Sequence, residues 1–346
     1  MQKFHMGVAL GSLITGEPIE LERLKGKKIA IDAFNTLFQF LTIIRDRTTG
    51  QPLMDSKGRV TSHLSGLFYR TANFIEAGLL PVYVFDGEPP AFKAAVIEER
   101  KTARDVAHVR WQFALAEGDL SEALKRAKMS ARLTGEMIEQ SKQLLTFMGV
   151  PWVQAPSEGE AQCAAMCSQK IVWASASQDW DSLLFGSPRM IRNLSVSGRR
   201  KIPRTGAYVE IKPELLELKD VLLKLGIDRE QLIAIGMLVG TDFNPGIHGI
   251  GPKKALALVK KHKKFSKIME SVKDKWTGPE PQEVLDFFKN PPVDKDVKIE
   301  SKPLQPDKIR QFMVDNFEFS LERVNKVIKT LSELKPSASG LGKFLK

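Results

Sequence analysis

The chain has 346 residues, 42% of them hydrophobic, which is enough to build a sizeable core in one large domain or two ordinary ones. No apolar run reaches the ~18 residues that a membrane-spanning helix needs, and residues 1–5 lack a secretory pattern, so we expect a cytoplasmic protein without a membrane partner. Lys and Arg number 52 against 41 Asp and Glu, and the resulting net charge of +11 favours a polyanionic partner, although other basic enzymes carry such a charge.

Three apolar segments, each leading to an aspartate, predict buried strands. They cover residues 28–32, 81–86 and 171–176, and the last runs on to Asp179. Helical patterns such as residues 63–76 separate them, which indicates an α/β fold with a central, mainly parallel sheet flanked by helices. In such a sheet the functional crevice lies beyond the carboxyl ends of the strands, where these aspartates are expected.

A highly charged helical stretch over residues 89–132 interrupts this alternation. It has too few apolar positions for a core helix, and it begins soon after the strand-end Asp86. It is either a solvated face or an arm over the active site, and its position favours the arm. Its basic residues are Lys93, Arg100, Lys101, Arg104, Arg110, Lys125, Arg126, Lys128 and Arg132.

The two cysteines lie four residues apart in an apolar helical pattern. They are Cys163 and Cys167, and a further helical pattern precedes them over residues 136–148. Two cysteines without clustered histidines cannot make a zinc site. We therefore expect two small buried side chains.

A glycine-rich segment follows Asp242 and runs from Gly246 to Lys254. Its small residues would let backbone N–H groups approach a phosphate at a helix N-terminus, with Lys253 and Lys254 adding positive charge. The pattern is typical of a helix-hairpin-helix turn, and an ordinary helix–helix turn is the alternative. Phosphate contacts of this kind position a duplex without reading its sequence.

Breakers and a polar tail organise the rest of the chain. Residues 278–281 and 290–292 flank one short predicted helix, and residues 307–335 predict two more. The segment 336–346 is rich in Ser, Gly and Lys and is expected to be disordered.

Seven acidic residues can be grouped as one site. Two closely spaced carboxylate pairs and the strand-end aspartates supply the oxygen ligands of two hard divalent cations, which together can hydrolyse a phosphodiester. Individual acids also have structural explanations, since Ser157 and Glu160 fit a capping box and Asp86-Gly87 fits a turn. Their combination favours a metal-dependent nuclease. The seven are Asp32, Asp86, Glu158, Glu160, Asp179, Asp181 and Asp242.

Long stretches around these motifs resemble archaeal flap endonucleases, members of the structure-specific 5′ nuclease family that includes excision-repair and Holliday-junction nucleases. The resemblance runs nearly end to end. It implies a PIN-like nuclease core with a helical arch and a helix-hairpin-helix motif. The matching stretches include residues 28–33, 62–70, 81–87, 155–161, 176–186 and 240–243.

The resemblance also implies roles for individual residues. The seven acids would hold two Mg²⁺ ions, for which Mn²⁺ can substitute, and Asp181 would act in catalysis. Lys93 and Arg100 match two basic residues at the foot of the family's arch, where they would contact the scissile phosphate. Phe38 matches an aromatic that stacks on a base near the cut, although its periodicity alone predicts a core residue. Arg70 is a candidate duplex contact.

In the hairpin turn the resemblance implies both DNA and ion binding. Gly249 and Gly251, with Lys253 and Lys254, would contact the duplex backbone. The family also places a K⁺ ion at this turn.

We expect one 5′ nuclease domain over residues 1–335, acting as a monomer. Within it the N-terminal region covers about 6–104, the arch about 88–132, and the internal nuclease region about 123–264, with the hairpin motif at about 240–264.

The tail 336–346 is the expected sliding-clamp-binding peptide, with Leu341 and Phe344 as its apolar anchors. The family's peptide has a Gln, then an aliphatic residue and two aromatics. Here Ala338 stands in place of the Gln and Leu345 in place of the second aromatic, which predicts weaker clamp binding.

The implied activity is a 5′ flap endonuclease with 5′–3′ exonuclease activity, acting on branched DNA in replication and repair at the archaeal nucleoid. Two alternatives stay open from the sequence. One is a ribonuclease of the related small PIN-type domains, which usually lack the hairpin turn. The other is a non-catalytic branched-DNA-binding or clamp-adaptor protein, which would be expected to have lost a key acid.

Overall fold

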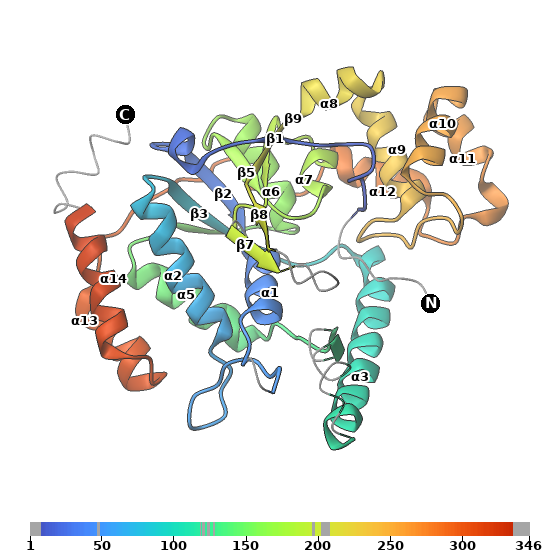
Figure 1. Ribbon diagram of the computed structural model, residues 1–346. Helices are drawn as coiled ribbons and strands as arrows, with labels where there is room; N and C mark the ends of the chain where they lie inside the picture. Colours follow the sequence, from blue (N-terminus) through green and yellow to red (C-terminus); the bar gives the residue numbers. More distant parts are fainter. Residues whose placement is uncertain are drawn as a thin grey trace.

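A central sheet organises the chain in the computed structural model, which describes residues 8–46, 49–117, 119, 122, 125–126, 129–195, 198–201 and 208–334. The sheet strands are β1 (Glu17–Pro18), β2 (Lys28–Asp32), β3 (Leu80–Phe85), β4 (Trp152–Gln154), β5 (Ala174–Ala176), β6 (Arg189–Arg192) and β9 (Glu214–Glu217). Within the described residues they pair in the order β1-β9-β6-β5-β2-β3-β4 (Figure 1). From β6 to β4 neighbouring strands are parallel, whereas β9 is antiparallel to both of its neighbours, β1 and β6, which confirms the predicted mainly parallel sheet.

Alternating side chains of the central strands pack against helices on both faces of the sheet. On one face Ile31 and Tyr83 contact the core beneath α1 (Ala33–Ile43), α2 (Ser62–Glu76), α5 (Gly135–Phe147) and α14 (Leu321–Leu334). On the other face Ala30 and Val84 pack against α6 (Gly159–Ser168). Because side chains alternate along a strand, one apolar run serves both layers.

A second core lies beside the β6 and β9 edge of the sheet (Figure 1). Ile247 of the glycine-rich turn and Trp180, between Asp179 and Asp181, both belong to this core, so it fixes the turn relative to the sheet. Its helices are α6, α7 (Asp181–Leu184), α8 (Leu218–Leu225), α9 (Arg229–Val239), α10 (Pro252–His262), α11 (Phe265–Glu270) and α12 (Pro281–Lys289).

One long helix, α3 (Ala94–Ala116), projects away from the sheet (Figure 1). It follows directly on the 3₁₀ turn η2 (Ala91–Lys93) and carries part of the charged stretch that the sequence predicts as an arm. The remaining elements are η1 (Leu21–Leu24), β7 (Gly198–Lys201), β8 (Tyr208–Ile211), η3 (Lys273–Lys275), α13 (Pro306–Arg310) and η4 (Gln311–Asn316).

Two of the predicted strands have different limits. The strand predicted over residues 171–176 is reduced to β5, because the N–H groups of Ile171 and Val172 donate to the Met166 carbonyl at 2.9 and 3.3 Å and close the end of α6. The strand predicted over residues 81–86 ends at Phe85, so Asp86 already lies beyond the sheet.

The helical predictions agree with the structure. The patterns over residues 63–76 and 136–148 correspond to α2 and α5, and the short helix between the Pro-rich breakers is α12. Cys163 and Cys167 are free and buried in α6, as expected. Among the described residues, no helix combines the length and apolar composition needed to cross a lipid bilayer.

Substituting Gly66 tests the contact between α1 and α2. A Cβ atom at Gly66 would lie 2.2 Å from Cγ of Phe40, whose side chain is 4% exposed and has little room to move. We expect Gly66→Ala to lower the free energy of unfolding by about 1–3 kcal/mol through overpacking, measured by denaturant titration. Gly135→Ala is the control, because a Cβ there meets nothing within 4 Å. Equal stability of both variants would contradict this packing.

Candidate active site

Three neighbouring parallel strands deliver aspartates to one edge of the sheet. Asp32 is the last residue of β2 and caps α1, accepting a bond from the Asn35 N–H at 3.1 Å. Asp86 directly follows β3, and Asp179 follows β5. These three acids were predicted from strand ends, and the structure brings them together because the strands are adjacent and parallel.

Helix termini supply the other four acids. Glu158 and Glu160 stand at the start of α6, Asp181 is the first residue of α7, and Asp242 follows α9. Six of the seven line one pocket of about 310 Å³, while Asp181 is 2% exposed and lies beneath it. The pocket is lined by Asp32, Phe34, Asn35, Phe38, Asp86, Gly87, Pro89, Lys93, Ile97, Arg100, Arg104, Leu133, Glu158, Glu160, Asp179 and Asp242.

Burial and mutual repulsion make these carboxylates hard to ionise. Burial, with a contribution from the charge of Glu158, raises the pKa of Asp32 to about 7. Burial and the charge of Asp242 raise the pKa of Asp181 to about 8. The pKa of Asp86 also lies well above its ordinary value, for the same two physical reasons. The cluster therefore requires positive charge to be fully ionised at neutral pH.

Two basic residues from the foot of α3 supply part of that charge. The Nζ of Lys93 donates to both carboxylate oxygens of Glu158 at 2.6 and 2.8 Å. Arg100 donates to both oxygens of Asp242 at 2.6 and 3.0 Å. Burial alone would lower the pKa of Lys93, but the charges of Glu158 and Asp242 outweigh it and raise that pKa. The ammonium and guanidinium groups therefore stay charged inside the pocket.

The predicted capping box at the start of α6 is wrong. The helix begins at Gly159 with Glu158 as its N-cap residue, so Ser157 lies outside the helix and makes no cap. Instead, the Gly159 N–H donates to Oδ1 of Asp86 at 2.7 Å. A carboxylate from a distant strand end thus satisfies the first helix N–H, and a Cβ at Gly159 would lie only 2.6 Å from the same oxygen.

The donor set fits a hard divalent cation, since it consists of carboxylate oxygens. Among the described residues, no three acidic, histidine or cysteine side chains stand close enough together to hold an ion as they are now oriented. Glu158 and Asp242 point toward Lys93 and Arg100, and Asp179 accepts a bond from Nδ2 of Asn35 at 2.5 Å. Side-chain rotation away from these partners is what an ion would require.

Of the predicted DNA-contacting residues, Phe38 lines the acidic pocket and Arg70 does not. Phe38 is half-buried at the mouth of the acidic pocket, where the Arg104 guanidinium lies over its ring at 5.5 Å, so it is not the core residue that periodicity indicates. Arg70 is half-buried on α2 and lies outside the acidic pocket.

The hairpin turn connects α9 and α10. Gly249 has φ of +77°, a left-handed conformation that favours glycine, and Gly251 caps α10. Lys253 is exposed, whereas the Nζ of Lys254 donates to the Gly249 carbonyl at 3.0 Å. The predicted clamp residues Leu341 and Phe344 lie outside the described residues.

Sequence reasoning missed two residues in the pocket. Asn35 holds Asp179, and Arg104 stacks on Phe38. Asn35 lies three residues after Asp32, the spacing of a residue at the first turn of a helix, which is a signal that could have placed it beside the acids. The Arg104 contact joins two distant elements and has no local signal.

Two protein-family models together cover all seven acids of the site. Residues 9–107 match the XPG N-terminal domain, and residues 149–242 match the XPG I-region. Flap endonuclease 1 of Staphylothermus marinus is 52% identical over 331 residues, which are 94% of this chain and 94% of that protein. Flap endonuclease 1 of Pyrococcus abyssi is 53% identical over 95% of this chain and 94% of its own length.

Solved structures agree with these relatives. The flap endonuclease-1 of Methanococcus jannaschii superposes with a TM-score of 0.75 at 40% identity, covering 95% of this chain and 98% of that one. Human GEN1 in complex with Holliday junction DNA superposes with a TM-score of 0.64 at 19% identity, covering 94% of this chain and 76% of that one. The second likeness shows the fold alone.

Removing one buried charge tests the repulsion in the cluster. The pKa of Asp181 is about 8 in the folded protein and 3.8 ordinarily. Between these pH values the carboxyl is therefore protonated in the folded protein and ionised in the unfolded chain. Without metal, the free energy of unfolding should therefore fall as pH rises through this window. We expect Asp181→Asn to be more stable than the parent at pH 8 in EDTA, by on the order of a few kcal/mol, because the amide has no charge to bury.

The measurement is thermal or denaturant unfolding in EDTA across pH 5–8, and Asp274→Asn is the control because that acid is exposed. If Asp181→Asn were less stable than the parent at pH 8, burial and the charge of Asp242 would not make an ionised Asp181 costly to the fold.

Proposed function

The chain belongs to the flap endonuclease 1 family, and from that premise we infer that it is a structure-specific 5′ nuclease that removes single-stranded flaps from DNA. The observation that carries the inference is the buried group of seven carboxylates beneath two basic residues from the foot of α3. The acids could bind metal ions that activate a water, and the two basic residues could bind the phosphate, so the pocket suits metal-dependent hydrolysis of a phosphodiester.

We propose that the seven acids hold two Mg²⁺ ions, with Mn²⁺ as a substitute. The charges of Asp32 and Glu158 act on Asp86, and those of Asp181 and Asp242 act on Asp179, so the acids fall into two groups of close neighbours. When bound, the ions would lower the pKa of an attacking water and stabilise the leaving oxygen. Asp181 is included because its charge lies beneath the pocket and interacts with Asp242.

Lys93 and Arg100 have the position and charge to stabilise the reacting phosphate. In this structure each side chain forms an ion pair with an acid: Lys93 Nζ lies 2.6 Å from Glu158 Oε2, and Arg100 Nη2 lies 2.6 Å from Asp242 Oδ1. Cations that neutralise those carboxylates would release Lys93 and Arg100 to face the scissile phosphate, whose negative charge increases in the transition state. The arch foot would thus exchange a protein carboxylate for the substrate's phosphate.

Substrate choice would rest on shape. The hairpin at Gly249 and Gly251, with exposed Lys253, suits the backbone of flanking duplex, and Phe38 suits stacking on a base beside the cut. Arg70 is assigned a duplex contact on the resemblance alone. A K⁺ ion at the hairpin would compete with the Lys254 ammonium for the Gly249 carbonyl.

The regions of the chain are assigned accordingly. We propose one nuclease domain over residues 1–335 with the arch at about 88–132, acting as a monomer at the nucleoid during replication and repair. Leu341 and Phe344 of the tail would bind a sliding clamp, which brings the enzyme to newly displaced flaps. An accompanying 5′–3′ exonuclease activity would use the same site.

The two alternatives from the sequence are not favoured. A small PIN-type ribonuclease does not account for identity of about half the residues with flap endonucleases over 94% of the chain. A non-catalytic binder does not account for the presence of all seven acids in one pocket or directly beneath it.

Cleavage of a 5′-labelled flap duplex in Mg²⁺ tests the site. We expect Lys93→Ala to lower the single-turnover rate about 10²–10³-fold, because it removes a donor that stabilises developing charge. Asp181→Ala should abolish cleavage while flap binding persists. Lys101→Ala is the matched control, since its ammonium is on the same helix but 61% exposed. Unchanged cleavage by Asp181→Ala would show that the assigned metal site is wrong.

The salt dependence of duplex binding tests the hairpin. We expect Lys253→Ala to weaken binding of an uncleavable flap duplex and to reduce the slope of log affinity against log salt by about 1, as loss of one phosphate contact requires. Lys302→Ala is the control, because it is an equally exposed lysine whose carbonyl lies beside Gly149, at the amino-terminal side of β4. Equal slopes for the two variants would remove Lys253 from the interface.

A further inference from the structure

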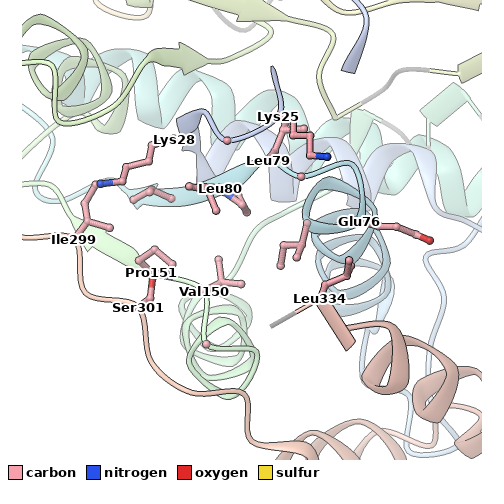
Figure 2. Close-up of a pocket in the computed structure, with 16 residues that line it drawn as sticks. Lys25, Lys28, Glu76, Leu79, Leu80, Val150, Pro151, Ile299, Ser301 and Leu334 are labelled. Carbon is pink, nitrogen blue, oxygen red and sulfur yellow. The ribbon is translucent and has the colours of Figure 1, made fainter. Parts of the chain in front are cut away.

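A second cavity lies at the edge of the sheet opposite the acids. It has a volume of about 500 Å³ and is bordered by Lys28 at the start of β2, Leu80 at the start of β3, and Pro151 just before β4 (Figure 2). The acids stand at or beyond the carboxyl ends of the same strands. This cavity, named here the rear pocket, therefore does not belong to the nuclease site.

The rear pocket is suited to apolar side chains. Leu79, Leu80, Val150 and Ile299 form its walls, with further aliphatic and proline side chains around them. Charged groups are confined to Lys25, Lys28 and Glu76 among the lining residues. An occupant would bury aliphatic or aromatic groups there, because few lining groups can hydrogen-bond a polar ligand.

The chain itself leads to the rear pocket. Leu334 is the last described residue, ends α14 and lines the pocket beside Glu76 with 47% of its side chain exposed (Figure 2). Helix α14 is fixed against α2 through buried Val324, Ile328 and Leu331, so the point at which the tail begins is set by the core.

The composition and length of the tail fit this position. In residues 335–346 the large apolar side chains are Leu341, Phe344 and Leu345, and the charged ones are lysines. At about 3.4 Å per extended residue, the chain from Leu334 reaches up to ~24 Å by Leu341 and ~34 Å by Phe344, which is ample for a return to a pocket that Leu334 already lines. Because Lys25 and Lys28 also line the pocket, the contact would depend on the apolar side chains of the tail and not on its lysines.

We propose that Leu341 and Phe344 of the tail dock in the rear pocket of the same chain. A short tether gives the tail an effective concentration in the mM range, so even a weak apolar contact would be populated without a partner. The same two side chains are those assigned to the sliding clamp, so docking would withhold them until a clamp competes. The docking does not depend on the nuclease assignment.

Disulfide trapping tests the docking directly. Ser301→Cys at the pocket is combined with Gly342→Cys in the tail of the full chain, and the same pair carrying Leu341→Ser and Phe344→Ser is the matched control, because it keeps the tether and removes the apolar side chains. The native Cys163 and Cys167 are only 1% and 2% exposed and should not compete. We expect the pair with Leu341 and Phe344 intact to close within one chain about tenfold faster than the control, independently of protein concentration.

Equal rates for the two pairs would overturn the proposal, and so would closure only between chains, which would mean that the pocket takes the tail of a second copy. Hydrogen exchange gives a second measurement in a variant that cannot disturb the core. Phe344→Ser should speed exchange of the amides of Leu79, Leu80 and Val82 about fivefold or more relative to the parent, because it removes a side chain that covers them. Unchanged exchange there would also overturn the docking.

Discussion

The burial of several carboxylates close to one another is the constraint on which the rest of this structure depends. Burial raises the pKa of Asp32 to about 7 and that of Asp181 to about 8, so these two carboxyls are partly protonated at neutral pH. The fold brings such groups together because their positions are set by strand and helix ends that the core holds in place. Lys93 and Arg100 offset part of the charge, and the foot of α3 is therefore tied to the acids. In the proposed mechanism, metal ions would replace that internal compensation and free both bases for the substrate.

The backbone around the acids is shaped by the same requirement. Asp86 accepts the first N–H of α6, which lets a carboxylate from β3 and the acids of α6 stand side by side. This close approach needs glycine at 159, since a Cβ would lie 2.6 Å from the Asp86 oxygen. A sequence pattern of Glu-Gly-Glu thus has two functions: the glutamates supply charge, and the glycine lets a third acid approach them.

Much of this arrangement could be predicted from the sequence, and the exceptions share a cause. Apolar runs ending in aspartate located β2 and β3, because a strand buried on both faces has a distinctive composition. Local pattern failed at α6, where Ser157 fits a capping box but the actual partner of the helix N–H is Asp86, distant in sequence. It also failed for the contact of Arg104 with Phe38 and for the pairing of β1 with β9, which joins two segments far apart in the sequence. Contacts between distant segments carry no periodic signal.

The polarity of the sheet explains how one small fold can separate two tasks. Parallel strands present all their carboxyl ends at one edge and all their amino ends at the other. The first edge collects acids at the ends of β2, β3 and β5, and the second is left apolar around Leu80, Val150 and Ile299. The rigid sheet lies between them, so occupation of the rear pocket need not alter the spacing of the carboxylates. A tail docked there would regulate where the enzyme is recruited while leaving its chemistry unchanged, which is the division of labour that the proposed clamp peptide and nuclease site require.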